Sequence, residues 1–496
     1  MKTAGLDIGT TGCKCTVFDE QGRNLGKAYR DYPVRRRVGG HEIDLSTVMD
    51  SVYAVIREMT AQYPDIGGVG VTSFGETFVM TDELGTPLHT AMLYTDPRGA
   101  EECAALVDRL GAETIARITG LAPPEMYSIA KIMWIRRHQP EVYRAAKHIF
   151  LIGDYVIWHL TGEARIDYSL ATRSMAFDIG KLAWSDAILD AAEVDASLLS
   201  PVVPTGTVAG CVSRAAAEKT GLRADCRIVM ISHDQVAAAV GAGAFDGETA
   251  VDGAGTVECL TPIYDRLPDI EVMRRGYFSV VPYVIPGKYV AYAFSYTGGA
   301  LIQWCVNTLA GAEQEQARRE GVSIHTWLEQ HYEGQGPTGL LVLPHFAGAA
   351  TPYMDTGSRG AILGLSVGTT LPEIYRACME GVAYEMRLNY DALADSGIHF
   401  TRLHATGGGA RSGVWTQMKA DMLNLPIVSL KTSDAGTVGS AMLTGVATGI
   451  FRDLAEAARI MVHPGETFEP DPVRHEQYMQ VYERYRKVYQ SVRPLV

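Results

Sequence analysis

Residues 229–243 read VMISHDQVAAAVGAG, an apolar run that ends at one histidine and one aspartate. The alanine-rich segment after Asp234 predicts a helix. A carboxylate at the end of a buried strand is costly to ionise, so its presence needs a reason. Two reasons remain open at this point. Asp is a frequent helix N-cap residue, and a carboxylate whose pKa is raised by burial can act as a general base.

A second polar stretch, DIGTTGCK at residues 7–14, combines two glycines with acidic, hydroxyl and basic side chains. Glycines let a backbone turn tightly and present N–H groups to phosphate oxygens. Thr10 and Thr11 would add hydroxyl donors, and Lys14 would add charge unless it faces solvent. Asp7 would repel bare phosphate, so it suits a hydrated magnesium ion that phosphate oxygens also bind. A plain hairpin turn is the alternative, because the stretch matches neither GxxxxGK[ST] nor GxGxxG.

A third stretch, ATGGGARSGVWTQMKADML at residues 405–423, places three glycines directly before a predicted helix. Such a turn allows a flat ligand or a phosphate to lie against backbone at a helix N-terminus. The alternative is that these glycines serve only the packing of the helix entry.

The elements that would position these residues follow an α/β order. Strands are predicted at residues 4–9 and 12–19, a helix at 45–63 and a buried strand at 66–73. A similar order restarts near residue 249, where Gly255-Thr256 repeats the strand–turn–strand setting of Gly9-Thr10. The sequence therefore predicts two α/β domains, residues 1–245 and 246–496, with the boundary in the Ala/Gly-rich region near 244–248.

Composition narrows the class of protein. The 496 residues carry a formal net charge of −13, which argues against a nucleic-acid or anionic-membrane binder. The eight cysteines form no CxxC pair, as expected for thiols in a reducing cytosol. The N-terminal stretch is not predicted to be a signal peptide, and no long apolar run predicts a membrane span.

Taken in order, these pieces resemble the FGGY family of carbohydrate kinases, part of the actin/hexokinase/Hsp70-like ATPase superfamily. Two stretches are more specific. MYSIAKIMWIRRH at residues 126–138 is similar to the first family signature, and GAILGLSVGTTLPEIYRACMEG at 360–381 is similar to the second, with Cys378 as its unusual member. HFAGAATPYMD at 345–355 resembles the loop that precedes the second signature.

The resemblance implies two ribonuclease-H-like domains around a deep cleft. The first would bind the sugar, and the second the nucleotide. It implies ATP and Mg²⁺ as cofactors, a small-molecule sugar or polyol as acceptor, a cytoplasmic enzyme and, as a family expectation, a homodimer. No nucleic-acid or membrane partner is expected.

The resemblance also assigns roles to residues. Asp234 matches the catalytic base, and with Asp7 it would lie near the metal. His233 is interpreted as a structural neighbour of the base. The implied nucleotide contacts are Thr10, Thr11, Gly255, Thr256, Gly299, Gln303, Gly408 and Gly409, with Lys14 added from its own loop. The implied acceptor contacts are Glu76, Tyr94, Asp96, Arg98 and Gln235.

The acceptor segments mix features of two subfamilies. Glu76 and Gln235 resemble glycerol kinases, which carry Arg-Glu-Thr at the first position and Asp-Gln at the base. Gly75 replaces that arginine, and Tyr94 stands where a tryptophan would pack against glycerol carbons. We expect Gly75 to open space for an acceptor longer than glycerol. The length of the chain and residues 154–163 are xylulokinase-like, so we expect a xylulose-like pentulose, a related ketose or a sugar alcohol.

Two other functions fit the same fold. A non-catalytic sugar- or nucleotide-binding regulator would have no need of Asp234, Asp7 and both Gly-Thr turns. Another actin-like or Hsp70-like ATPase would not need the carbohydrate-kinase signatures. We therefore favour a carbohydrate kinase.

Overall fold

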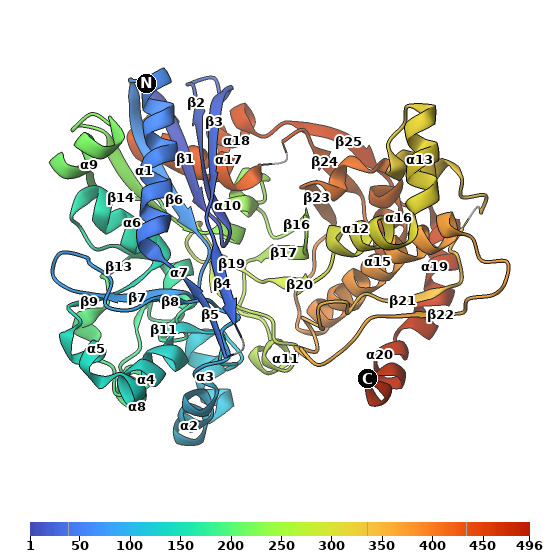
Figure 1. Ribbon diagram of the computed structural model, residues 1–496, viewed down its shortest axis with the longest axis horizontal. Helices are drawn as coiled ribbons and strands as arrows, with labels where there is room; N and C mark the ends of the chain where they lie inside the picture. The colour runs from blue at the N-terminus through green and yellow to red at the C-terminus, as the bar shows by residue number, and fades with distance from the viewer. Residues whose placement is uncertain (38, 335, 433) are drawn as a thin grey trace. The chain divides into compact units, whose positions relative to one another are not determined.

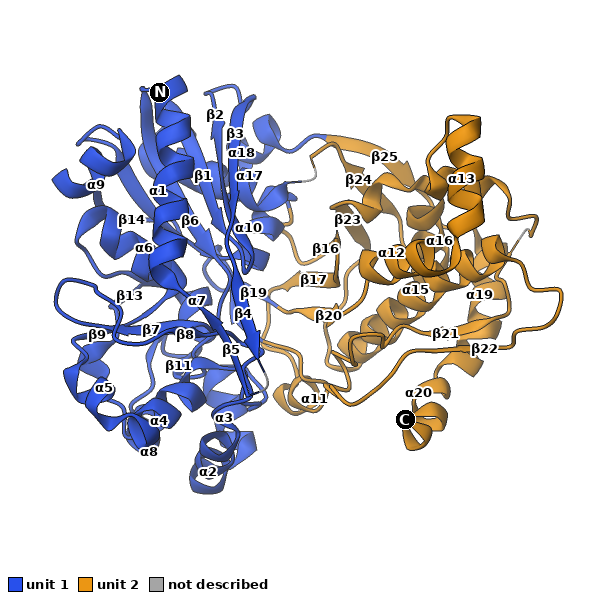
Figure 2. Cartoon of the chain, in the orientation of Figure 1, with its two compact units in different colours: residues 1–243, 280–290, 434–463 blue, residues 244–279, 291–433, 464–496 orange. Residues whose placement is uncertain are grey.

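Two sheets with the same strand pattern form the cores of two compact units (Figures 1 and 2). The structure is a computed structural model that describes residues 1–37, 39–334, 336–432 and 434–496. Unit 1 comprises residues 1–243, 280–290 and 434–463, and unit 2 comprises residues 244–279, 291–433 and 464–496.

The main sheet of unit 1 begins with an antiparallel meander and continues with parallel strands. β1 pairs antiparallel with β2, and β2 with β3, whereas β1, β6 and β15 run parallel. Such parallel strands are buried on both faces, as the apolar sequence of residues 66–73 predicts. In spatial order the strands are β14 (Thr207–Cys211), β15 (Arg227–His233), β6 (Ile66–Ser73), β1 (Lys2–Ile8), β2 (Gly12–Phe18) and β3 (Asn24–Asp31).

A second sheet of unit 1 lies in the order β4 (Val34–Arg37), β5 (Gly40–Ile43), β8 (Ala91–Met92), β7 (Phe78–Thr81) and β9 (His148–Leu151). It holds both predicted acceptor segments, because β7 follows residues 72–77 and β8 precedes residues 93–99. The helices of this unit are α1 (Leu45–Gln62), α2 (Ala100–Leu110), α3 (Ala112–Thr119), α4 (Ser128–His138), α5 (Pro140–Ala145), α6 (Ile152–Thr161), α7 (Tyr168–Thr172), α8 (Asp186–Ala192), α9 (Arg214–Thr220), α10 (Asp234–Gly241), α17 (Ala435–Thr448) and α18 (Leu454–Met461).

Helices α10 and α17 cross at glycines. A Cβ on Gly241 would overlap the carbonyl oxygen of Ala435, and a Cβ on Gly439 would overlap the carbonyl oxygen of Ala237. Helix α17 also packs on β1 and β6, where Gly5 lies against the backbone of Thr437. The glycines at these positions let the backbones approach more closely than any side chain would permit.

Unit 2 repeats the meander and the parallel strands. β20 and β16 flank β17 in antiparallel pairing, and β16, β23 and β24 run parallel before the antiparallel β25. The strands are β20 (Ala293–Ser295), β17 (Glu258–Tyr264), β16 (Thr249–Ala254), β23 (Arg402–Thr406), β24 (Ile427–Leu430) and β25 (Pro464–Phe468).

The hydrophobic core of unit 2 centres on the long helix α15. Buried side chains of this helix, among them Cys378 and Tyr384, cluster with Leu301, Trp415 and Tyr478 from neighbouring helices. The helices of the unit are α11 (Ile270–Arg275), α12 (Gly299–Leu309), α13 (Gly311–Glu320), α14 (Ile324–Gln330), α15 (Leu371–Asp395), α16 (Gly413–Leu423), α19 (Pro472–Tyr485) and α20 (Val488–Val492). Among the described residues, no helix combines the length and the apolar character that crossing a membrane requires.

The helix predicted at residues 45–63 is α1, and its apolar positions are buried at helical spacing. The domain boundary predicted near residues 244–248 lies where the long first segment of unit 1 ends, at Gly243. The chain then returns to unit 1 at residues 280–290 and 434–463, so the compact units are interleaved along the sequence rather than contiguous halves.

Candidate active site

Three parallel strands of unit 1, β1, β6 and β15, end at the same edge of the sheet. Ile8 of β1 lies opposite Ser73 of β6, which lies opposite His233 of β15. The Gly9–Gly12 turn, the first acceptor segment and Asp234 follow these three residues. The strand register therefore brings the three stretches to one edge of the sheet, which is where open α/β sheets bind their ligands.

The Gly9–Gly12 turn is a tight hairpin. The Gly9 amide donates to the carbonyl oxygen of Gly12 over 2.9 Å, and the Tyr32 hydroxyl donates to the carbonyl oxygen of Gly9. A side chain at Gly12 would overlap the hydroxyl of Tyr29. Thr10 is half-buried and Thr11 is exposed.

Lys14 lies between two carboxylates and does not extend freely into solvent. Its Nζ is 3.0 Å from Oδ2 of Asp7 and 2.7 Å from Oδ1 of Asp434. Burial alone would lower the pKa of Lys14, but the charges of Asp7 and Asp434 raise it above its usual range. Burial raises the pKa of Asp7, and Lys14 opposes that shift. Asp434 comes from the segment that returns to unit 1 and was missed by the sequence analysis.

Asp234 is the first residue of α10, and the N-cap position belongs to His233, which makes no side-chain capping bond. The helix-cap interpretation of Asp234 is therefore wrong, although a carboxylate in the first turn still interacts favourably with the helix dipole. About a third of its side chain is exposed, 31%. Burial, followed by the negative charges of Asp7 and Glu76, raises the pKa of Asp234 to about 7.

His233 lies beside this carboxylate, with Nε2 3.3 Å from Oδ1 of Asp234. Its backbone amide donates to the hydroxyl of Ser169 over 2.9 Å. Burial, with the nearby charge of Arg173, lowers the pKa of His233 well below its usual value. The imidazole is therefore neutral near pH 7 and provides no counter-charge for Asp234.

Arg173 and Glu76 form a buried ion pair in the acceptor segment. The Nε of Arg173 donates to Oε1 of Glu76 over 2.6 Å, and its Nη2 contacts the same oxygen. Glu76 has a left-handed backbone, with φ of 61°, and the hydroxyl of Ser128 donates to its carbonyl oxygen over 2.6 Å. The guanidinium lies 5.1 Å from the ring centroid of Tyr127.

Gly75 does not open the space that we expected from the sequence. A Cβ built on Gly75 would lie 2.6 Å from Cγ of Arg173 and 3.1 Å from Cδ2 of His233. Arg173 comes from the end of α7 and fills the volume beside the glycine. The small residue therefore admits an arginine from another element rather than a longer acceptor.

The other predicted acceptor residues divide into two groups. Tyr94 lies near Glu76 and Asp234, whose charges raise its pKa further after burial has raised it. Gln235 is half-buried on α10. Asp96 is buried and accepts from the backbone amide of His41 over 2.8 Å and from the Nη2 of Arg98 over 2.6 Å.

Arg98 donates to Glu42 over 2.8 Å and lies 5.2 Å from the ring centroid of Trp134. Asp96 and Arg98 therefore bind one another and neighbouring elements of the fold.

Lys131 of the first signature is fully buried, and its Nζ donates to the carbonyl oxygen of Glu125 over 2.6 Å. Burial lowers the pKa of Lys131 to about 8.

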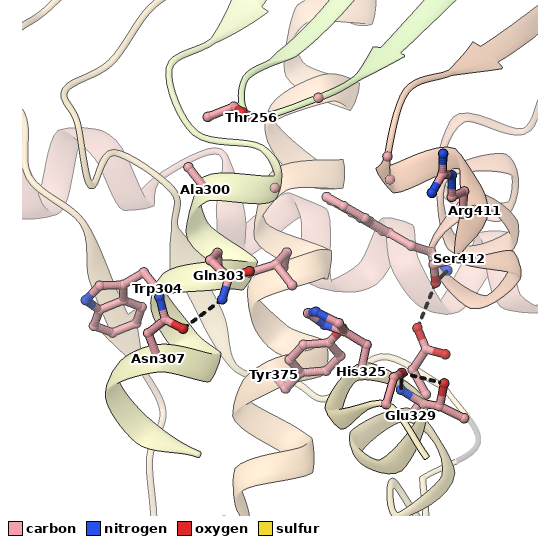
Figure 3. Close-up of a pocket in the computed structure, with 18 residues that line it drawn as sticks. Thr256, Ala300, Gln303, Trp304, Asn307, His325, Glu329, Tyr375, Arg411 and Ser412 are labelled. Carbon is pink, nitrogen blue, oxygen red and sulfur yellow. Dashed lines mark hydrogen bonds between the residues drawn. The ribbon is translucent and has the colours of Figure 1, made fainter. Parts of the chain in front are cut away.

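Unit 2 contains a cavity of about 930 Å³ that gathers all of the predicted residues of this unit (Figure 3). These residues are Gly255, Thr256, Gly299, Gln303, Gly408 and Gly409. They come from three places in the sequence, namely the β16–β17 turn, the start of α12 and the loop after β23.

The β16–β17 turn and α12 are joined by backbone hydrogen bonds. The amide of Gly299 donates to the carbonyl oxygen of Gly255 over 2.9 Å, and the amide of Ala300 donates to the carbonyl oxygen of Thr256 over 3.1 Å. A Cβ on Gly299 would lie 2.8 Å from the carbonyl oxygen of Gly255. Only glycine permits this approach, which explains the second residue of the Gly298-Gly299 pair.

The rest of the cavity lining was missed by the sequence analysis. His325 and Tyr375 meet there, with Nδ1 3.0 Å from the hydroxyl oxygen, and the hydroxyl of Ser412 donates to Glu329 over 2.7 Å. Trp415 completes the wall near the glycine loop. His325 and Glu329 lie on α14, Tyr375 lies on α15, and Ser412 and Trp415 lie at the start of α16.

Among the residues that the structure describes, no three His, Cys, Asp or Glu side chains gather as metal ligands. Asp7 fits a hydrated magnesium ion in part. It is a partly accessible carboxylate beside a glycine turn, but one of its oxygens is shared with Lys14. Mg²⁺ usually takes one or two protein carboxylates and keeps phosphate and water as its other ligands, so such a site needs no cluster.

Comparison with known proteins identifies the family and supports the fold. Residues 3–241 match the model for the N-terminal domain of the FGGY family of carbohydrate kinases, and residues 255–448 match the model for its C-terminal domain. A xylulose kinase of Lactococcus lactis subsp. lactis is 26% identical over 98% of this chain and 96% of its own.

A glycerol kinase of Halorhodospira halophila is 31% identical over 94% of this chain and 91% of its own, and an autoinducer-2 kinase of Escherichia coli is 30% identical over 99% and 94%. The solved xylulose kinase of Rhodospirillum rubrum is 26% identical and superimposes with a TM-score of 0.88, covering 100% of this chain and 99% of that one. Each unit therefore has the α/β fold of the actin/hexokinase/Hsp70-like ATPases. The chain belongs to the FGGY family of carbohydrate kinases, phosphotransferases that use ATP and an alcohol group as acceptor.

Proposed function

We propose that this kinase transfers the γ-phosphate of ATP to a hydroxyl of a neutral ketose, such as a xylulose-like pentulose, or of a sugar alcohol. The observation that carries the proposal is the position of Asp234. Its carboxylate lies partly exposed at the edge where three strands end, from which the Gly9–Gly12 turn also projects, and burial raises its pKa to about 7.

Asp234 acts as the general base for the acceptor hydroxyl. Phosphoryl transfer depends mostly on positioning and charge neutralisation, with one group accepting the hydroxyl proton. A base is most effective when its pKa lies near the working pH. Gln235 and Tyr94 lie beside this carboxylate and orient the acceptor, whereas Asp96 and Arg98 hold the acceptor segment in place.

Unit 2 supplies the nucleotide contacts. The cavity of about 930 Å³ is of the size that small-molecule cofactor sites have. The Gly255–Thr256 turn and Gly299 face the phosphates, and Gly408 and Gly409 face the adenosine. In unit 1, Thr10 and Thr11 offer N–H and hydroxyl donors to the transferred phosphoryl group.

Mg²⁺ bound with ATP would neutralise charge on the β- and γ-phosphates. Asp7, with Asp234, would hold it through water. Lys14 already neutralises part of the charge of Asp7 and Asp434, which keeps this edge of the sheet from repelling phosphate.

The charge balance of the acceptor segment favours a neutral acceptor. Glu76 is neutralised by Arg173, so the buried pair offers hydrogen bonds but no net charge. Hydroxyl groups are the natural partners of such a pair. The similarity to both xylulose and glycerol kinases agrees with a polyhydroxylated acceptor.

The test is an acceptor panel. The protein is mixed with Mg-ATP and with ketoses, aldoses, polyols and sugar acids in turn, and ADP release is followed. We expect ADP formation with a ketose or polyol, and kcat/KM for sugar acids at least about tenfold lower, because an acid would place a second negative charge beside Asp234. A preference for a sugar acid would contradict the neutral-acceptor proposal, and no acceptor-dependent ADP with any compound would contradict the whole assignment.

A further inference from the structure

A buried lysine lies between the two loops to which we assign the nucleotide. Lys419 of α16 has 2% of its side chain exposed, and its Nζ donates to Oδ2 of Asp252 over 2.9 Å and to Oε1 of Glu258. The two carboxylates are themselves buried. Buried charges of this kind are costly unless they are paired and hydrogen-bonded, so the cluster has to be explained.

The two carboxylates flank the Gly255–Thr256 turn. Asp252 lies on β16, three residues before Gly255, and Glu258 lies on β17, two residues after Thr256. In the antiparallel register Ala254 faces Glu258 and Asp252 faces Leu260, so both acidic side chains project from the same face of the hairpin. Lys419 therefore binds both strands of the hairpin close to its turn.

The buried groups of the cluster act on one another's pKa values. Burial, followed by the charge of Asp252, raises the pKa of Glu258 well above its usual value. Burial alone would lower the pKa of Lys419, but the two carboxylates raise it. The members of the cluster therefore depend on one another, because removing one of them would leave the others buried without their partner.

The helix that carries Lys419 starts at the other loop. The glycine loop leads into α16, whose N-cap Ser412 accepts the amide of Trp415 over 3.1 Å. Lys419 Nζ lies 4.7 Å from the ring centroid of Trp415, which lines the cavity. A Cβ on Gly409 would lie 2.9 Å from Cβ of Ala254 and 3.0 Å from Cζ3 of Trp415, so the loop rests on the strand that precedes the turn.

We propose that Lys419 is a positioning residue for the nucleotide. By tying β16 and β17 to α16, it fixes the spacing between the Gly255–Thr256 turn and the Gly408–Gly409 loop, so that the two loops meet a nucleotide with no rearrangement. This inference rests on the proposed function, because both loops have to bind the nucleotide. Preorganised contacts cost less ordering entropy on binding, which is the benefit that the cluster brings.

A purely structural role would predict a different result. In that case the cluster would contribute stability but not nucleotide affinity, and a neutral replacement would bind as well as the wild-type protein. Replacing a buried ionic group by neutral residues of similar shape often leaves stability unchanged or improved. The test variant is therefore the triple substitution D252N/E258Q/K419M, which removes every charge together, with Lys419→Met as a second variant.

The control variant is Glu385→Gln. It breaks another buried pair of unit 2, in which Glu385 lies 3.1 Å from Nε2 of His345 and accepts from the hydroxyl of Tyr485. Neither Glu385 nor its partners line the nucleotide cavity. A general loss of stability would therefore weaken ADP binding in the Glu385 variant and in the Lys419 variants alike. A change in the spacing of the two loops would weaken ADP binding only in the Lys419 variants.

The affinity for ADP is measured by calorimetry, with thermal unfolding and hydrogen exchange recorded for each protein. We expect the triple variant to bind ADP about tenfold more weakly, with faster amide exchange at residues 253–257 and 407–412, and Glu385→Gln to bind as the wild type does. Unchanged ADP affinity in the triple variant would overturn the positioning role and leave the kinase assignment intact. No binding of ADP to the wild-type protein would overturn the nucleotide site itself, and the positioning role with it.

Discussion

Asp234 is the residue whose ionisation should limit the reaction. Only the carboxylate form can accept the hydroxyl proton, and burial raises its pKa to about 7. Activity should therefore be lost as the pH falls through about 7 and be fully present above it. The measurement is kcat/KM for the acceptor between pH 5 and 9. A limb near the ordinary pKa of an aspartate would show that this carboxylate is not the base.

Substitution of the same residue separates chemistry from nucleotide binding. Asp234→Ala should lower acceptor-dependent turnover by about 10²-fold or more, the usual loss for a general base. ADP affinity should stay within about twofold, because the whole lining of the cavity of about 930 Å³ comes from other residues. Turnover measurements check the expected loss of catalysis, and calorimetry checks the expected retention of ADP affinity. Near-normal turnover would mean that another group is the base.

Arg173 should determine both the affinity for the acceptor and the position of the acidic limb, which is the pH range in which activity is lost as the pH falls. Arg173→Met leaves Glu76 buried without its counter-charge and removes a positive charge that lowers the pKa of Asp234. KM for the acceptor should rise about tenfold, and the acidic limb should move to higher pH. Arg173→Lys, which keeps the charge, should leave the limb nearly in place. An unchanged limb in Arg173→Met would show that the guanidinium does not act on the base.

At the scale of elements, the α10–α17 crossing holds the base in position. The first residue of α10 is Asp234, and the helix is fixed to α17 by backbone contact at Gly241 and Gly439. The crossing allows no side chain at either glycine, so any substitution forces the helices apart. Small shifts of α10 would move the carboxylate away from the edge where the strands end.

Gly241→Ala should therefore lower the free energy of unfolding by about 1–3 kcal/mol, as overpacking does in other cores. A matched control is Gly311→Ala in α13, where a new Cβ would have nothing within 4 Å. That substitution should be neutral or stabilising by up to about 1 kcal/mol, because alanine favours a helix. Denaturant unfolding measures both. Equal effects of the two substitutions would show that the crossing tolerates a side chain.

Local patterns predicted the elements that have a strong period or a strong turn signal. Examples are α1 and the two Gly-Thr turns, each of which is predicted from one short stretch of sequence. The partners of the site came from elsewhere in the chain and left no local mark. Arg173 reaches Glu76 over 97 positions of sequence, and Asp434 reaches Lys14 from a segment assigned to the other domain. Gly75 was misinterpreted for the same reason, because what fills the space beside it is set by α7.

At the scale of the whole molecule, the interleaved chain makes unit 1 depend on its last segment. Helix α17 packs on β1, β6 and α10, and Asp434 forms ion pairs with Lys14 and Lys27. Without residues 434–463, the apolar face beside Gly5 and Gly70 would be exposed, and one carboxylate partner of Lys14 would be lost. We therefore expect that a contiguous N-terminal fragment does not fold by itself.

We predict that residues 1–243 alone do not unfold cooperatively, whereas the same fragment joined through flexible linkers to residues 280–290 and 434–463 does. Without α17, the faces of β1, β6 and α10 on which it packs would be exposed, and each Å² of apolar surface exposed costs about 25 cal/mol against a typical margin of about 5–15 kcal/mol. Circular dichroism during heating and limited proteolysis compare the two proteins, with a version carrying a scrambled 434–463 segment as the control for length and composition. Cooperative unfolding of residues 1–243 alone, at the temperature of the joined protein, would show that unit 1 is complete without the returning segment.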